Sequence, residues 1–163
     1  MQSEYILQTP VGPARATVSD GAVTAFEFAA SQGTAAGSGV NDDAARQLQA
    51  NLDEYFAGRL PDPERGLRLA PRGTAFQLAV WAELSKIPSG TLITYARLAQ
   101  RCGRPRACRA AGAACGVNPI ALLIPCHRVV GSDGGLHGYA YGVEVKRALI
   151  ELEAKWYGKH MDV

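Results

Sequence analysis

The sequence predicts an α+β fold in two units, an α/β first half with an antiparallel sheet and a mainly helical second half. Alternating apolar and polar residues, punctuated by tight-turn residues, run through the first 28 positions. A segment rich in proline and glycine, 59–73, separates this half from the next. Two short helical patterns joined by a glycine-containing turn then follow, an arrangement typical of a helix-turn-helix. The predicted domains are therefore 1–72, which includes the connecting segment, and 73–163.

In the first domain we expect strands at 5–9, 14–18 and 23–28, with Ser19-Asp20-Gly21 as a hairpin turn. Residues 29–39, rich in alanine, glycine, serine and threonine, predict a flexible surface loop. A helix then begins at the Asn41-Asp42-Asp43 cap and ends at Gly58. Its predicted inner face consists of Ala45, Leu48, Leu52, Tyr55 and Phe56.

In the second domain, Thr74 and Gln77 fit a capping box, which begins a helix that stops at Ile87-Pro88-Ser89-Gly90. Leu92 and Ile93 predict a short extended piece, and Thr94 then caps a helix over 95–101. A second helix is expected over 107–115, made almost entirely of small residues. A last helix is expected from 144 to about 156. Its predicted inward residues are Val145, Leu149 and Leu152.

Composition and charge exclude some classes of protein. With 47% hydrophobic and 20% charged residues the chain can build a core, yet no apolar run approaches the ~20 residues that span a bilayer. The first residues lack a signal-peptide pattern, so we expect a cytoplasmic protein, or a nuclear one in a eukaryote. Residues 97–128 hold six arginines and no acid, which suits either a polyanion or a merely solvated face.

The four cysteines all lie in the second half, at Cys102, Cys108, Cys115 and Cys126. None forms a Cys-x-x-Cys pair, and no histidine has ligand spacing to them, so we expect free thiols and no zinc site. Only Cys126 has a histidine beside it, His127, and a thiol reacts as thiolate when a base or a favourable charge assists.

The Cys126–His127 pair becomes useful only if the chain turns there, because neighbours on a strand point to opposite faces. Pro125 and the glycines that follow permit such a turn, and Glu151 or Glu153 on the last helix could orient the imidazole. On spacing alone, a buried structural cysteine is an equally good interpretation.

The residues around Cys126 resemble those of a known protein family. Pro125-Cys126-His127-Arg128-Val129, preceded by Asn118-Pro119 and followed by Gly138-Tyr139, resembles the active-site signature of the O6-alkylguanine-DNA alkyltransferase family. Arg109-Ala110-Ala111-Gly112-Ala113 resembles the recognition helix of that family. The similarity covers roughly 74–156 in register and extends more loosely into the first domain. It implies a ribonuclease H-like first domain and a winged helix-turn-helix-like second domain.

The resemblance also implies roles. Cys126 would accept the alkyl group from guanine O6, or from thymine O4, once per molecule, while His127 takes the thiol proton through a water and Glu153 orients His127. Asn118 would brace the turn. Arg109 and Ala110 on the recognition helix, with Tyr95, would bind DNA in the minor groove and extrude the damaged nucleotide. The groups expected to contact the substrate or DNA further include Arg128, Val129, Tyr139 and Ala140.

The family further implies that no metal or organic cofactor takes part, and that a monomer acts on double-stranded DNA, with cooperative binding as an option. Two positions depart from the family pattern. Tyr141 replaces the usual glycine and is expected to narrow the pocket against benzyl-type adducts, and Cys115 replaces a larger residue or asparagine. The competing classes are a non-reactive binder of damaged DNA, which would lack the cysteine, and a Cys-His-Glu acyl-transfer hydrolase.

Overall fold

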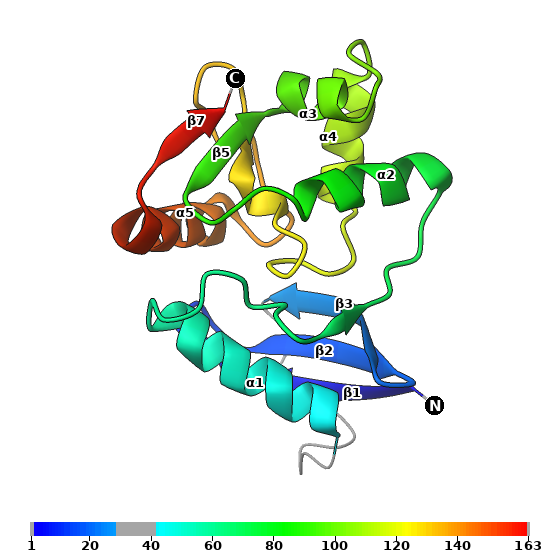
Figure 1. The fold of residues 1–163 in the computed structure, drawn as a ribbon, viewed down its shortest axis with the longest axis vertical. Coiled ribbons are helices and arrows are strands. Elements are labelled where there is room, and N and C mark those ends of the chain that lie inside the picture. The colour runs from blue at the N-terminus through cyan, green and yellow to red at the C-terminus, as the bar shows by residue number, and fades with distance from the viewer. Residues whose placement is uncertain (1, 29–41, 163) are drawn as a thin grey trace. The chain divides into compact units, whose positions relative to one another are not determined.

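The computed structural model describes residues 2–28 and 42–162, which form two compact units (Figure 1). The first contains Met1–Arg72 and Pro119–Leu123, and the second contains Gly73–Asn118 and Ile124–Val163. The predicted α+β class is confirmed. The division differs from the expected one in Pro119–Leu123, because this apolar segment extends the first sheet. Within the first unit, Ile120 forms a parallel bridge with Phe26, and the Phe26 amide donates to the Pro119 carbonyl at 2.9 Å.

The sheet of the first unit has the order β1-β2-β3-β4. Strands β1 (Gln2–Leu7), β2 (Ala14–Ser19) and β3 (Ala22–Phe28) are antiparallel, and β1 begins three residues earlier than predicted. The β2–β3 turn has positive φ at both Asp20 (51°) and Gly21 (79°), the conformation that matches the twist of a hairpin. Strand β4 (Arg68–Leu69) pairs parallel to β3 and lies in the segment that we predicted to be a bare connection. Its two residues are too few to produce a readable pattern.

Helix α1 (Asp43–Phe56) lies against this sheet (Figure 1). The Asp42 side chain caps it by accepting from the amides of Ala44 and Ala45. The predicted inner face is buried except for Phe56, which is half-buried. An unpredicted residue, Asn51, is also buried, because its amide donates to the carbonyls of Pro63 (2.9 Å) and Arg65 (2.8 Å) and so holds the connecting segment. The loop predicted at 29–39 lies outside the described residues.

The second unit contains helices α2 (Ala75–Leu84), α3 (Tyr95–Arg101), α4 (Cys108–Gly116) and α5 (Val143–Tyr157). Both bonds of the Thr74 and Gln77 capping box are present, and Thr94 caps α3 as expected. The Trp81 indole donates to the Ala114 carbonyl at 2.9 Å and thereby joins α2 to α4. In the described part of the chain, no helix combines the length and apolarity needed to cross a bilayer.

The second unit is less purely helical than predicted, because it holds a parallel sheet of order β6-β5-β7 (Figure 1). Strand β5 (Thr91–Thr94) covers the predicted extended piece, whereas β6 (Val129–Val130) and β7 (His160–Asp162) were missed. Both are short, and β7 lies in a polar tail. Pairing with β5 satisfies backbone groups that the side-chain pattern of these segments does not reveal.

Helix α5 also buries a different stripe from the predicted one. Lys146, Leu149, Ile150 and Glu153 are buried at helical spacing, whereas Val145 and Leu152 are half-buried. A lysine and a glutamate occupy the inner face because both find hydrogen-bond partners in the second unit. Lys146 and Glu153 are therefore the two residues through which α5 takes part in the candidate site.

Candidate functional site

Cys126 lies on a turn of the chain and not on a strand. Residues Cys126–Arg128 form one turn of 3-10 helix between the buried run before Pro125 and strand β6. The Cys126 amide donates to the Ile124 carbonyl at 2.8 Å. The side-chain amide of Asn118 donates to the same carbonyl, also at 2.8 Å. Asn118 therefore braces the turn from six residues upstream, the position at which the sequence placed it.

Cys126 is 7% exposed as a residue, and burial raises the pKa of its thiol. Two neighbours act in the opposite direction, a hydrogen bond with the Asn118 side chain and the positive charge of Lys146. The thiol therefore lies in a buried site that contains one hydrogen-bonding amide and one cation, both of which favour the thiolate.

Lys146 is the site residue that sequence reasoning missed. Its side chain is buried, and Nζ donates to the carbonyls of Leu136 (2.6 Å) and Gly138 (3.3 Å). A longer contact of 3.4 Å reaches the Tyr95 hydroxyl, and Nζ lies 5.7 Å from the centre of that ring. The only available signal was a lysine within the apolar stripe of a helix. Lys146 thus connects α5, the loop that follows β6, and Tyr95.

His127 and Glu153 form the predicted pair. The His127 Nε2 atom lies 2.8 Å from Glu153 Oε2, and both side chains are almost fully buried, whereas Glu151 is exposed. With the proton on Nε2, the Nδ1 lone pair is available, and Nδ1 makes no hydrogen bond to any described residue. Burial lowers the pKa of His127 against the opposing effect of Glu153, so the imidazole is neutral near pH 7 and can accept a proton.

Arg128 is not a contact for DNA, so this prediction was wrong. The side chain is 2% exposed, and its guanidinium binds Glu153 through Nε to Oε1 (2.8 Å) and Nη2 to Oε2 (2.9 Å). The remaining donors reach the Ile87 carbonyl (2.5 Å) and the Ser89 hydroxyl (2.8 Å). Burial would raise the pKa of Glu153, but His127 and Arg128 together hold that pKa far below its ordinary value.

The arginine-rich stretch 97–128 therefore forms a smaller exposed basic patch than its six arginines suggested. Arg97 and Arg101 form ion pairs with Asp162 of β7, and Arg104 lies over the ring of Phe76. Arg106 and Arg109 are exposed. Arg109 lies in the first turn of α4, next to exposed Ala110, as the sequence predicted.

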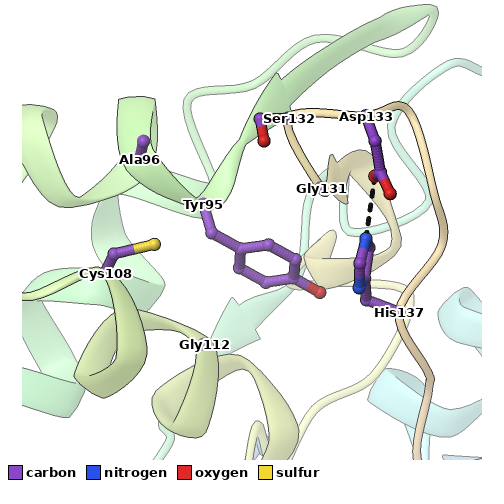
Figure 2. Close-up of a pocket in the computed structure, with 8 residues that line it drawn as sticks. All are labelled: Tyr95, Ala96, Cys108, Gly112, Gly131, Ser132, Asp133 and His137. Carbon is purple, nitrogen blue, oxygen red and sulfur yellow. Dashed lines mark hydrogen bonds and ion pairs between the residues drawn. The ribbon is translucent and has the colours of Figure 1, made fainter.

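Tyr95 borders a cavity of about 500 Å³ between α4 and the loop after β6 (Figure 2). The ring extends from the start of α3 toward this loop, with Cys108 and Gly112 of α4 on one side. On the other side, His137 and Asp133 form a pair at 2.8 Å that covers Gly131, where a Cβ atom would clash with the imidazole. Burial raises the pKa of Tyr95 to about 12, so its hydroxyl remains a donor at neutral pH. Cys126 is not among the residues that line this cavity.

The other predicted site residues lie around the same loop. Val129 is fully buried in β6, and its amide donates to the Cys126 carbonyl. Tyr139 packs edge-on against half-buried Tyr141, with ring centres 5.5 Å apart, and Ala140 is exposed. The Tyr139 hydroxyl is buried without a partner among the described residues. Over residues 2–28 and 42–162, no three histidine, cysteine, aspartate or glutamate side chains are placed to share a metal.

Comparisons with known proteins agree on one family. Residues 75–155 match the model of the DNA-binding domain of 6-O-methylguanine DNA methyltransferase. A methylated-DNA–protein-cysteine methyltransferase of Methanosarcina barkeri is 52% identical over 111 residues, which cover 68% of this chain and 66% of that protein. The Mycobacterium tuberculosis O6-methylguanine methyltransferase superimposes with a TM-score of 0.83 at 36% identity, over 95% of this chain and 94% of that one. The structure of M. tuberculosis OGT in complex with DNA gives a TM-score of 0.82 at the same identity, over 94% of this chain and 93% of that one.

Proposed function

This chain belongs to the methylated-DNA–protein-cysteine methyltransferase family, and we propose that it repairs DNA by transferring an alkyl group from guanine O6 to Cys126. The main support for this proposal is the set of groups that surround the Cys126 thiol. A cysteine on a braced turn, near a buried cation and followed by a neutral His127 that is bonded to the Glu153 carboxylate, is arranged for nucleophilic attack.

In the proposed reaction His127 Nδ1 takes the thiol proton through one water, while Nε2–H remains bonded to Glu153. The thiolate attacks the alkyl carbon in line, a carbon–sulfur bond forms, and the bond from carbon to O6 breaks. The electron pair leaves with guanine, which takes up a proton. The resulting thioether has no route back to a thiol, so each molecule acts once. An alkyl group on thymine O4 can be displaced in the same way, and O4-alkylthymine is a second proposed alkyl donor in DNA.

A thiol on a buried residue such as Cys126 cannot reach a base inside a duplex, so the damaged nucleotide must leave the stack. Helix α4 supports this step, because its exposed face consists of small residues such as Ala110 and Ala113 that allow close approach to the minor groove. Exposed Arg109 would fill the vacated position, and Tyr95 would press on the phosphate. Tyr139 and the backbones of Cys126, Val129 and Ala140 would contact the guanine, although the Val129 amide is already bonded to the Cys126 carbonyl.

We further propose a monomer on double-stranded DNA, possessing a ribonuclease H-like first unit and a winged helix-turn-helix-like second unit. Cooperative binding and a cytoplasmic location, or a nuclear one in a eukaryote, also remain predictions.

The proposal is tested with a duplex oligonucleotide that carries one O6-methylguanine. Intact mass should show one methyl group gained on the wild-type protein, located at Cys126, and none on Cys126→Ala. Binding without an adduct would support a non-reactive damage binder. Turnover of an ester or amide would support a hydrolase.

The role of Arg109 is tested separately with Arg109→Ala, and with Arg106→Ala as a control that removes an equally exposed charge from the preceding turn. Arg109→Ala should slow reaction with duplex DNA far more than reaction with the free O6-alkylguanine base, and Arg106→Ala should not separate the two rates. Equal losses on both substrates in Arg109→Ala would contradict base extrusion.

A further inference from the structure

Arg128 has a hydrogen-bonding pattern that packing alone does not require. Its guanidinium holds both oxygens of Glu153 through Nε and Nη2, and the Ile87 carbonyl and Ser89 hydroxyl fix it from the opposite side. The planar guanidinium fork matches the carboxylate plane, so two parallel bonds prevent the carboxylate from rotating. The orientation of Glu153 is therefore set by Arg128.

We propose that Arg128 is a positioning residue, which acts through Glu153 to keep His127 neutral and in the Nε2–H tautomer. This inference rests on the proposed alkyl transfer to Cys126. Glu153 Oε2 accepts from Arg128 Nη2 at 2.9 Å and lies 2.8 Å from His127 Nε2. A carboxylate oxygen fixed at that point can only accept, so Nε2 must carry a proton, and in the neutral imidazole Nδ1 then presents its lone pair.

The charges around His127 explain why an arginine is needed. An ionised carboxylate next to an imidazole, taken alone, stabilises the imidazolium, which cannot accept a proton from a thiol. Arg128 supplies a positive charge on the same carboxylate and offsets this effect. Lys146, from the same helix as Glu153, adds a second positive charge that acts on His127. The Cys126 thiol and the Tyr139 hydroxyl have raised pKa values and are neutral in their protonated forms, so neither adds a charge to the site. The carboxylate thereby orients the imidazole without making it cationic.

The test uses two variants of the full chain. Arg128→Gln removes the charge but keeps a donor for Glu153, and Arg128→Lys keeps the charge but loses the fork. The matched control is Arg59→Gln, which breaks an exposed arginine–glutamate pair in the first unit. The readout is the single-turnover rate of methyl transfer to Cys126 from saturating duplex O6-methylguanine DNA as a function of pH.

In Arg128→Gln, which lacks the guanidinium charge, the acidic limb of the profile of rate against pH should move to higher pH by about one unit or more. The reason is that Glu153 then favours the imidazolium form of His127. Arg128→Lys should be slower than wild type but keep the wild-type midpoint, and Arg59→Gln should match wild type in both respects. A purely structural role would lower the rate without moving the midpoint, and an unchanged midpoint in folded Arg128→Gln would overturn the inference.

A measurement on the wild-type protein covers the case in which Arg128→Gln does not fold. Nitrogen-15 NMR of the His127 ring should show Nε2 protonated and Nδ1 unprotonated, and this state should persist below the ordinary histidine pKa. An Nδ1–H tautomer, or an imidazolium near pH 7, would refute the assignment. A protein that acquires no methyl group would refute alkyl transfer instead, and this NMR result would stand independently of it.

Discussion

The neutral state of buried His127 has a consequence for stability that can be measured without DNA. Burial, the largest cause, lowers the pKa of His127 in the folded protein below its ordinary value of 6.5, which the unfolded chain retains. Below pH 6.5 the unfolded chain therefore binds a proton that the folded chain does not bind. This contribution to stability is present above pH 6.5 and is lost as the pH falls toward the folded pKa.

The magnitude follows from linkage. If the folded imidazole stays neutral, moving from about pH 7.5 to about pH 5.5 should lower the free energy of unfolding by about 1.4 kcal/mol through His127 alone. The pKa of Glu153 is also depressed, but its contribution disappears only below its unfolded value of 4.5, outside this range. The other two histidines, His137 and His160, are exposed. The difference between the wild-type protein and His127→Gln, which leaves both of these histidines in place, therefore isolates the contribution of His127.

The assay is urea unfolding at both pH values, followed by tryptophan fluorescence. Trp81 and Trp156 both lie in the second unit, so the signal reports the unit that holds the site. The comparison variant, His127→Gln, can still donate to Glu153 but cannot titrate. It should be less stable overall and should lack most of the pH dependence over this interval. The same slope in both proteins, or a wild-type protein that becomes more stable at lower pH, would refute the assignment of a neutral buried imidazole.

Three further predictions follow from the site and its supports. Lys146→Met should raise the pKa of the Cys126 thiol and slow its alkylation at neutral pH by about tenfold per unit, as measured by rate against pH; an unchanged profile would contradict a role for the lysine charge. Thr74→Ala should cost about 1 kcal/mol of unfolding free energy in denaturant titrations by removing the α2 cap, and a loss below a few tenths would show that this cap is dispensable. Tyr141→Gly should increase reactivity toward free O6-benzylguanine more than toward O6-methylguanine, and equal gains would contradict a narrowed pocket.

Local chemistry in the sequence predicted the helix starts well, whereas the bracing role of Asn118 was implied by the family resemblance. Asp42, Thr74 and Thr94 act on amides two or three residues away, so their effect is visible in a short window of sequence. The Asn118 brace spans only six residues. For the same reason, the positions of α2 and α3 were close to the predicted ones.

Long-range partners explain the failures. Strand β7 exists because the chain after α5 returns to pair with β5, some seventy residues earlier in the sequence. Lys146 gives no local sign that its ammonium group bonds the carbonyls of Leu136 and Gly138. The sequence likewise gives no local sign that Arg128 is buried, because its partner Glu153 lies 25 residues away. Charge counts along a sequence overestimate a surface patch whenever a buried acid lies elsewhere in the chain.

Because Pro119–Leu123 belongs to the first unit, the chain passes between the units three times, after residues 72, 118 and 123. A fragment that begins at residue 73 would keep every candidate catalytic side chain but would lose β3, which bridges to Ile120. The apolar residues 120–123 would then lose their partner strand, three positions before the reactive thiol. If the first unit opens locally, the segment 120–123 that leads into the Cys126 turn is no longer held by β3. We therefore expect the position of the Cys126 thiol to depend on the stability of the first sheet, although none of the candidate catalytic residues lies in that sheet.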